Sequence, residues 1–158
     1  LLKGLLSPVM ESAVNYVNAP VVAKERGLKI LESKGEGVGD FTSSIVVKAK
    51  NGTENLEVEG AIFGAKHPRI VRVNDFYLEA VPSGYILILQ NNDVPGVVGA
   101  VGTILGNNGI NIAGMELGRS SKGGNAISFT HVDEMVSKKA IDELLALPQI
   151  VSAELVKL

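Results

Sequence analysis

The fold of the second half is decided by the stretch YILILQNNDVPG, residues 85–96. Its first five residues form a continuous apolar run, which is typical of a strand covered on both faces. The polar residues that follow break this strand and introduce a helix. We expect Asp93 to be the N-cap of that helix and Pro95 to lie in its first turn.

The pattern continues in both directions from this stretch. Apolar residues at helical spacing predict a helix from Val97, which Asn108 and Gly109 end. Two strands, about 110–118 and 125–132, follow and are joined by a glycine-rich turn. Ser137 is expected to cap a second helix, which Pro148 closes, and a last strand alternates through 151–155. The order β-α-β, hairpin, β-α-β is the ferredoxin-like pattern, in which two helices cover one face of a four-stranded antiparallel sheet.

The first half is less regular. Proline and glycine at residues 82 and 84 mark a boundary, so we expect two domains, 1–82 and 83–158. Helical spacing predicts helices over 1–18 and 20–26. Strands are predicted over 28–34, 43–50, 54–63, 69–73 and 76–81, with hairpin turns at Asn51-Gly52 and Asn74-Asp75. A glycine-rich loop, 35–40, is expected to be a connection only. The whole chain is therefore predicted to be α+β, with a small antiparallel domain preceding the βαββαβ domain.

Composition excludes several classes of function. The chain has 158 residues, a formal net charge of −2 and no cysteine. We therefore expect no nucleic-acid partner, and disulfides, thiolate metal sites and cysteine nucleophiles are excluded within it. No apolar run is long enough to span a membrane. The two histidines lack a third ligand, so we predict no metal, and we find no catalytic motif. The chain begins with leucine, which suggests a piece of a longer protein.

The most informative candidate site lies where the first strand of the second half meets its helix. Backbone N–H groups at a helix start favour an anion such as an α-carboxylate, and Asp93 would attract an α-ammonium. The asparagine side chains there can donate and accept hydrogen bonds. On spacing alone, a simple helix cap is the commoner interpretation. The candidate residues are Asn91, Asp93, Val94, Pro95, Gly96 and Asn111.

A second candidate is a basic cluster that could bind phosphate or another anion, formed by Lys66, Arg69 and Arg72. Two arginines can clamp an anion. However, residues three apart on a regular strand point to opposite faces, so a shared site would need a bulge or a twist. The alternative is a solvated basic edge strand, which resists edge-to-edge aggregation.

The motifs NNDVPGVV (91–98) and NGINI (108–112) together resemble the signature of ACT domains. ACT domains are regulatory modules that bind amino acids, and their fold is the βαββαβ order predicted above. The resemblance covers the whole second half.

Motifs in the first half resemble the segment after the catalytic core in long-form D-3-phosphoglycerate dehydrogenases. They are LSPVM (6–10), YVNAP (16–20), AKERG (23–27), GAIFG (60–64) and RIVRVN (69–74). In that family an allosteric-substrate-binding domain precedes a C-terminal ACT domain, so the resemblance spans the whole chain.

The resemblance implies feedback regulation by L-serine, bound between ACT domains of two subunits, in a cytoplasmic homo-oligomer. Its ligand positions correspond to Asn91, Asp93 and Asn111 with the backbone near 94–96, and Arg69 falls at a basic anion-binding position. Family members commonly carry an aromatic residue or histidine at position 91, so another small amino acid is the alternative ligand. The parent enzyme would use NAD, but its catalytic and nucleotide-binding motifs are absent here, so this chain is expected to be inactive alone and without a cofactor.

Two other functions remain open from the sequence. The chain could be the small-domain and ACT subunit of an L-serine dehydratase, although no histidine lies near the serines at its start. It could also be a free-standing amino-acid sensor.

Overall fold

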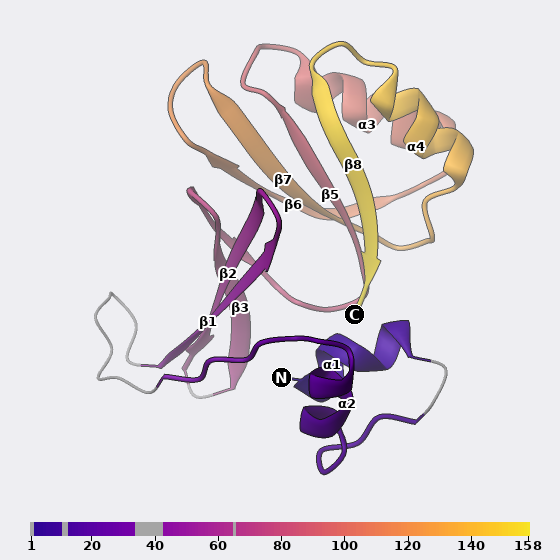
Figure 1. Cartoon of the computed structure of the whole chain (residues 1–158). Helices are drawn as coiled ribbons and strands as arrows, with labels where there is room; N and C mark the ends of the chain where they lie inside the picture. The colour runs from indigo at the N-terminus through magenta and orange to yellow at the C-terminus, as the bar shows by residue number, and fades with distance from the viewer. Residues whose placement is uncertain (1, 11–12, 34–42, 65) are drawn as a thin grey trace. The chain divides into compact units, whose positions relative to one another are not determined.

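The structure, a computed structural model, describes residues 2–10, 13–33, 43–64 and 66–158 (Figure 1). The chain forms two compact units, residues 1–38 and 39–158. The predicted glycine-rich connection, 35–40, lies outside the described residues. The predicted domain boundary at 82/83 stays a prediction.

The first unit is helical. It contains α1 (Leu2–Leu6), the short 3-10 helix η1 (Ser7–Val9) and α2 (Ala19–Glu25), which confirms the short helix predicted over 20–26. Among its described residues, the buried hydrophobic side chains are those of Leu6, Val14, Ala19 and Ala23.

Two predictions for this unit were wrong. The helix predicted over 1–18 does not continue past Val9, since the next residue, Met10, has extended backbone with φ −113° and ψ 130°. Further along, the side-chain oxygen of Asn15 accepts hydrogen bonds from the backbone N–H groups of Val17 and Asn18 and holds a separate turn. The strand predicted over 28–34 is absent from 28–33, the part that is described.

The second unit begins with an antiparallel sheet of four strands in sequence order: β1 (Ser44–Asn51), β2 (Glu54–Phe63), β3 (His67–Val73) and β4 (Phe76–Ala80). Both predicted hairpins are confirmed. Asn51 pairs with Glu54 across the first turn, and Asn74 adopts a positive φ of 49° in the second. The register shifts between Ile70 and Arg72, so β3 carries an irregularity between the two candidate arginines.

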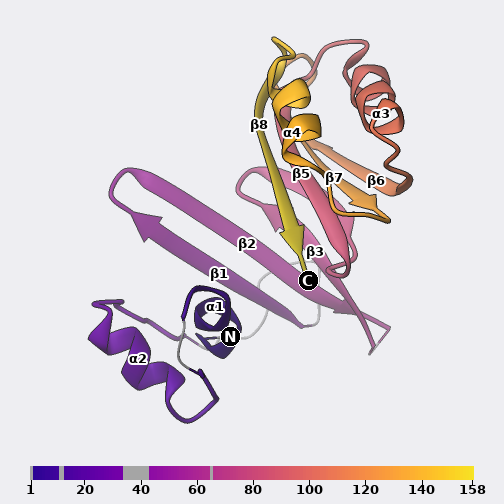
Figure 2. The same ribbon diagram turned by 90° about the vertical axis from the view of Figure 1, so that its right-hand side faces the viewer.

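A second antiparallel sheet follows, in the strand order β6-β7-β5-β8. It contains β5 (Tyr85–Asn92), β6 (Ile112–Arg119), β7 (Asn125–Val132) and β8 (Ile150–Lys157), with the helices α3 (Val97–Asn107) and α4 (Lys138–Leu145) between them in the chain. Both helices cover the same face of this sheet (Figures 1 and 2). The predicted βαββαβ order is confirmed, and Ser137 caps α4 by accepting the N–H of Ala140.

Strand β5 is buried on both faces, as its apolar run predicts. On one face Leu87 and Leu89 pack with α3 and α4. On the other face Ile86 packs with Ile127 and Phe129 of β7 and with the buried residues of β3 and β4. The second sheet therefore lies between its own helices and the first sheet, and this burial fixes the end of β5 from which the candidate site projects.

Candidate functional site

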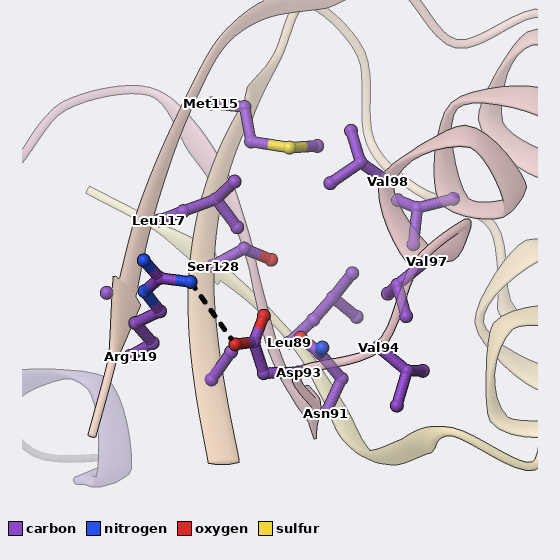
Figure 3. A pocket seen from close by; sticks show the side chains of 13 residues that line it. Leu89, Asn91, Asp93, Val94, Val97, Val98, Met115, Leu117, Arg119 and Ser128 are labelled. Carbon is purple, nitrogen blue, oxygen red and sulfur yellow. Dashed lines mark hydrogen bonds and ion pairs between the residues drawn. The ribbon is translucent and has the colours of Figure 1, made fainter. Parts of the chain in front are cut away.

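A cavity of about 270 Å³ lies at the head of α3, between that helix and the second sheet (Figure 3). Its wall is apolar over most of its area, and its polar groups gather near the end of β5. The volume is just below the roughly 300–1,000 Å³ of typical ligand pockets, so it suits a small metabolite. The lining residues are Leu89, Asn91, Asp93, Val94, Val97, Val98, Val101, Met115, Leu117, Gly118, Arg119, Ala126 and Ser128.

Asp93 is placed by the hairpin between β6 and β7, and the prediction that it caps α3 was wrong. The N-cap is Gly96, whose φ of 90° turns the chain into the helix without a side-chain hydrogen bond. Asp93 instead accepts a hydrogen bond from the N–H of Gly123 at 3.0 Å and an ion-pair contact from Arg119 at 3.5 Å. Pro95 precedes the helix, which begins at Val97.

Asn91 is fixed more firmly than Asp93. Only 6% of its surface is exposed, and its side-chain Nδ2 donates to the carbonyl of Asn92 at 2.8 Å. Its backbone sits in the middle of the sheet, paired with Ala126 on one side and Ile150 on the other. Asn91 therefore presents a preorganised amide at the base of the cavity, beside Asp93 (Figure 3).

Two polar lining residues were missed by the sequence reasoning, Arg119 and Ser128. Met115, Leu117 and Arg119 are two residues apart along β6. Because alternate residues of a strand point to the same face, this spacing already indicated that Arg119 lies beside the other two. Ser128 alternates with Ile127 and Phe129 along β7, so it lies on the opposite face of the sheet from them. In the structure that face is covered by α3, and Ser128 is 3% exposed.

Asn111 is not brought into this cavity. It lies beyond the opposite end of α3, where its side-chain Nδ2 donates to Asp133 Oδ2 at 2.6 Å. A helix of 11 residues is about 16 Å long. Asn111 and Asp93 of one chain are therefore held at the two ends of the helix, and a single ligand cannot bridge them within that chain.

The basic cluster of the first sheet is not an open anion clamp. Arg72 is enclosed by two carboxylates, with Nη2 2.6 Å from Glu57 Oε1 and 3.1 Å from Glu59 Oε2. The hydrogen bond to Glu57 raises the pKa of Arg72. Arg69 is half-buried and donates to the carbonyl of Pro68. An anion bound here would meet Arg69 and Lys66, whereas at Arg72 it would have to displace a carboxylate.

Within the described parts of the chain, no group of three potential ligands is placed to hold a metal ion. No helix there is long and apolar enough to cross a membrane.

Comparisons with known proteins match both halves of the chain. Residues 1–74 match the family model for the D-3-phosphoglycerate dehydrogenase intervening domain, and residues 85–149 match the ACT domain. The fold and the cavity thus define an ACT-domain protein.

The relatives lead to a particular family. The D-3-phosphoglycerate dehydrogenase of Bacillus subtilis is 39% identical over all of this chain and 30% of its own length. That of Archaeoglobus fulgidus is 38% identical over 100% of this chain and 30% of its own length, and that of Synechocystis is 35% identical over 99% and 28%. The chain belongs to the D-3-phosphoglycerate dehydrogenase family and corresponds to its C-terminal part. It spans about 30% of the length of these relatives.

Proposed function

We propose that this chain is the regulatory part of a D-3-phosphoglycerate dehydrogenase and binds L-serine as a feedback inhibitor between the ACT domains of two copies. The observation that carries the proposal is the cavity at the head of α3, where a carboxylate, a buried amide and apolar walls converge. In the whole cytoplasmic enzyme, oxidation of 3-phosphoglycerate with NAD would take place in domains outside these residues.

The separation of Asp93 from Asn111 supports a site shared between copies. Each lies at one end of α3, so they can meet on one ligand only if two helices lie side by side in opposite directions. A twofold axis produces this arrangement, because it brings residue i of one copy to residue j of the other and the reverse. Two equivalent sites would then form at one interface.

The surroundings of the cavity suit such an interface. Val94, Val98 and Leu117 lie at the cavity with 47%, 50% and 55% of their surfaces exposed, which is a cluster of apolar side chains open to a partner. β6 is also an edge strand of its sheet, so its outer backbone groups can pair with another strand.

Calorimetric titration with L-serine tests the ligand. The wild-type chain is expected to bind, and Asp93→Asn is expected to weaken binding by roughly ten- to a hundredfold, because a hydrogen bond to a charged group contributes about 1.5–3 kcal/mol. Asp75→Asn is a matched control, since Asp75 is an exposed aspartate in the β3–β4 turn. Absence of heat with wild-type protein at millimolar serine, or equal affinities for all three proteins, contradicts the proposal.

The shared site has its own test in the state of assembly. Sedimentation velocity with and without L-serine should show a dimer or larger assembly that Leu117→Asp weakens. A chain that stays monomeric at high concentration would overturn the shared-site proposal while leaving binding by a single copy open to the titration.

A further inference from the structure

The cavity contains one feature that the proposed ligand set does not use. Asp93 and Arg119 are the two charged residues among those that line it, and they form an ion pair with each other. They come from different elements: Asp93 follows β5, and Arg119 ends β6. Figure 3 shows the two side chains facing each other across one end of the cavity.

This ion pair is easily opened. Its closest approach, Arg119 Nη1 to Asp93 Oδ2, is 3.5 Å, and 63% of the Arg119 side chain is exposed to solvent. Exposed pairs of this kind contribute little to stability. The remaining guanidinium N–H groups of Arg119 have no protein partner among the described residues, so most of its hydrogen-bonding capacity is available to a ligand.

Asp93, in contrast, stays in place when Arg119 moves. Its Oδ2 also accepts the N–H of Gly123, and its backbone N–H donates to the carbonyl of Gly124 at 2.8 Å. The β6–β7 hairpin therefore holds Asp93 by contacts that do not involve Arg119. One member of the pair is fixed, and the other can turn away by rotating its own side chain.

We propose that Arg119 binds the α-carboxylate of the ligand, while Asp93 binds its α-ammonium group, so that the site is selective for free α-amino acids. The inference rests on the proposed function and names the recognition chemistry of that same site. An α-amino acid carries its two charges on neighbouring groups, so its receptor needs an anion and a cation close together. The guanidinium fork also matches the geometry of a carboxylate, which can accept two parallel hydrogen bonds.

The rest of the cavity fits this orientation. With the charged groups at Asp93 and Arg119, the side chain of the ligand extends toward the apolar wall formed by Leu89, Val97 and Val101. Ser128 is 3% exposed, and its hydroxyl has no protein hydrogen bond among the described residues. It lines the same cavity and can bond to a small polar ligand side chain. In the empty protein the two charges neutralise each other, and the ligand exchanges that contact for two contacts of its own.

The other possible receptor for the carboxylate is the start of α3, whose first N–H groups lack helical partners. The two receptors are distinguished by a ligand that lacks the negative charge. L-serinamide keeps the ammonium group and the side chain of L-serine but has a neutral amide in place of the carboxylate. If a variant without Arg119 binds L-serine and L-serinamide with equal affinity, then Arg119 is the group that binds the carboxylate.

The experiment is calorimetric titration of the full chain with L-serine, L-serinamide and L-valine, at a pH below the pKa of the serinamide amine. The variants are Arg119→Met, which removes the charge, and Arg119→Lys, which keeps it without the fork. Lys122→Met is the matched control, because it removes one positive charge from the exposed hairpin next to Arg119. Thermal unfolding of each variant verifies that it is folded.

We expect wild-type protein and Lys122→Met to prefer L-serine to L-serinamide by at least about tenfold. Arg119→Met should bind L-serine about tenfold more weakly than the wild type and should bind L-serine and L-serinamide with equal affinity. Arg119→Lys should restore part of the preference for L-serine. An Arg119→Met protein that keeps the wild-type preference overturns the inference and leaves the amino-acid site intact. Binding of L-valine alone, dependent on Arg119, supports the inference and overturns serine as the ligand. If neither amino acid binds the wild type, the proposed function fails together with the inference.

Discussion

The two sheets have the same number of strands but reach stability in different ways. The β5–β8 sheet has α3 and α4 on one face and forms a large core with them. Between Ser44 and Ala80, the described residues of the β1–β4 sheet include no helix. Three of its buried residues pack instead on Ile86, Ile127 and Phe129 of the second sheet, namely Val73 on β3 and Leu78 and Ala80 on β4. β1 is exposed along nearly its whole length.

The comparison shows that burial is concentrated on the strands that contact the helices on one face and the first sheet on the other. β5 and β7 are covered on two faces, whereas β1 contributes mainly backbone pairing to β2. The cavity at the head of α3 lies on the helix side of β5 and β7, and the first sheet packs on their other side. The cavity is therefore built on the strands that are buried on both faces.

The largest expected effect comes from a cavity-creating substitution in the shared core. Leu87 is fully buried between the second sheet and its helices, so Leu87→Ala should lower the free energy of unfolding by about 2–5 kcal/mol. Leu56→Ala on β2 is the matched control, because Leu56 is 48% exposed. Leu56→Ala should lower the free energy of unfolding by about 1 kcal/mol or less. Urea unfolding measures both, and equal losses would contradict the unequal roles of the sheets.

The second effect concerns the contact between the sheets. A methyl group on Gly118 would lie 2.7 Å from the backbone oxygen of Tyr77 and 3.3 Å from the β-carbon of Phe76. Gly118→Ala should therefore push β4 away from β6 and cost about 1–3 kcal/mol. Gly114→Ala, on the same strand, meets nothing closer than Glu116 Oε1 at 3.8 Å. Thermal unfolding measures the Tm of both variants. An equal decrease in Tm for the two would show that the sheets do not pack as described.

The smallest effect is a pH dependence of the first sheet. Hydrogen bonds from Lys48 and then from Arg72 lower the pKa of Glu57 below 4.5. A carboxyl whose pKa is lower in the folded state stabilises the fold above its unfolded pKa, and this stabilisation is lost as the pH falls through the folded value. Glu57→Gln should therefore flatten the loss of stability below about pH 4.5. An unchanged pH profile in urea unfolding would contradict the role of the Lys48–Glu57–Arg72 network.

The second half provides the comparison for that measurement. Hydrogen bonds from Lys139 and Asn108 lower the pKa of Glu143 on α4 as well. Glu143→Gln should therefore also reduce the loss of stability at low pH. The two variants together show whether the acid sensitivity of the protein is shared by both halves of the chain or belongs to one.

The second half was predictable from the sequence because its signals are local. The apolar run of β5, the Ser137 cap and Gly109 at the end of α3 each act on neighbouring residues. Asp93 was misassigned for the opposite reason. Its actual partner is the N–H of Gly123, 30 positions further along the chain, and only the folded hairpin brings the two together.

The first half was less predictable because its decisive contacts are side chain to backbone or sheet to sheet. The turn held by Asn15 lies within the predicted first helix, although the apolar spacing continues through it. Arg72 was considered as an anion ligand because its carboxylate partners, Glu57 and Glu59, lie on another strand and are recognised only from the register of β2 and β3.

The most direct test of the central claim mixes two variants that each lack half of the shared site. Asp93→Ala and Asn111→Ala should each lose binding of L-serine. In a twofold dimer that contains one copy of each, one site carries both substitutions and the other is intact. After mixing and re-equilibration, calorimetry should detect wild-type affinity at about one quarter of the sites. Mixed dimers that form but bind no serine would contradict a site shared between Asp93 of one copy and Asn111 of the other.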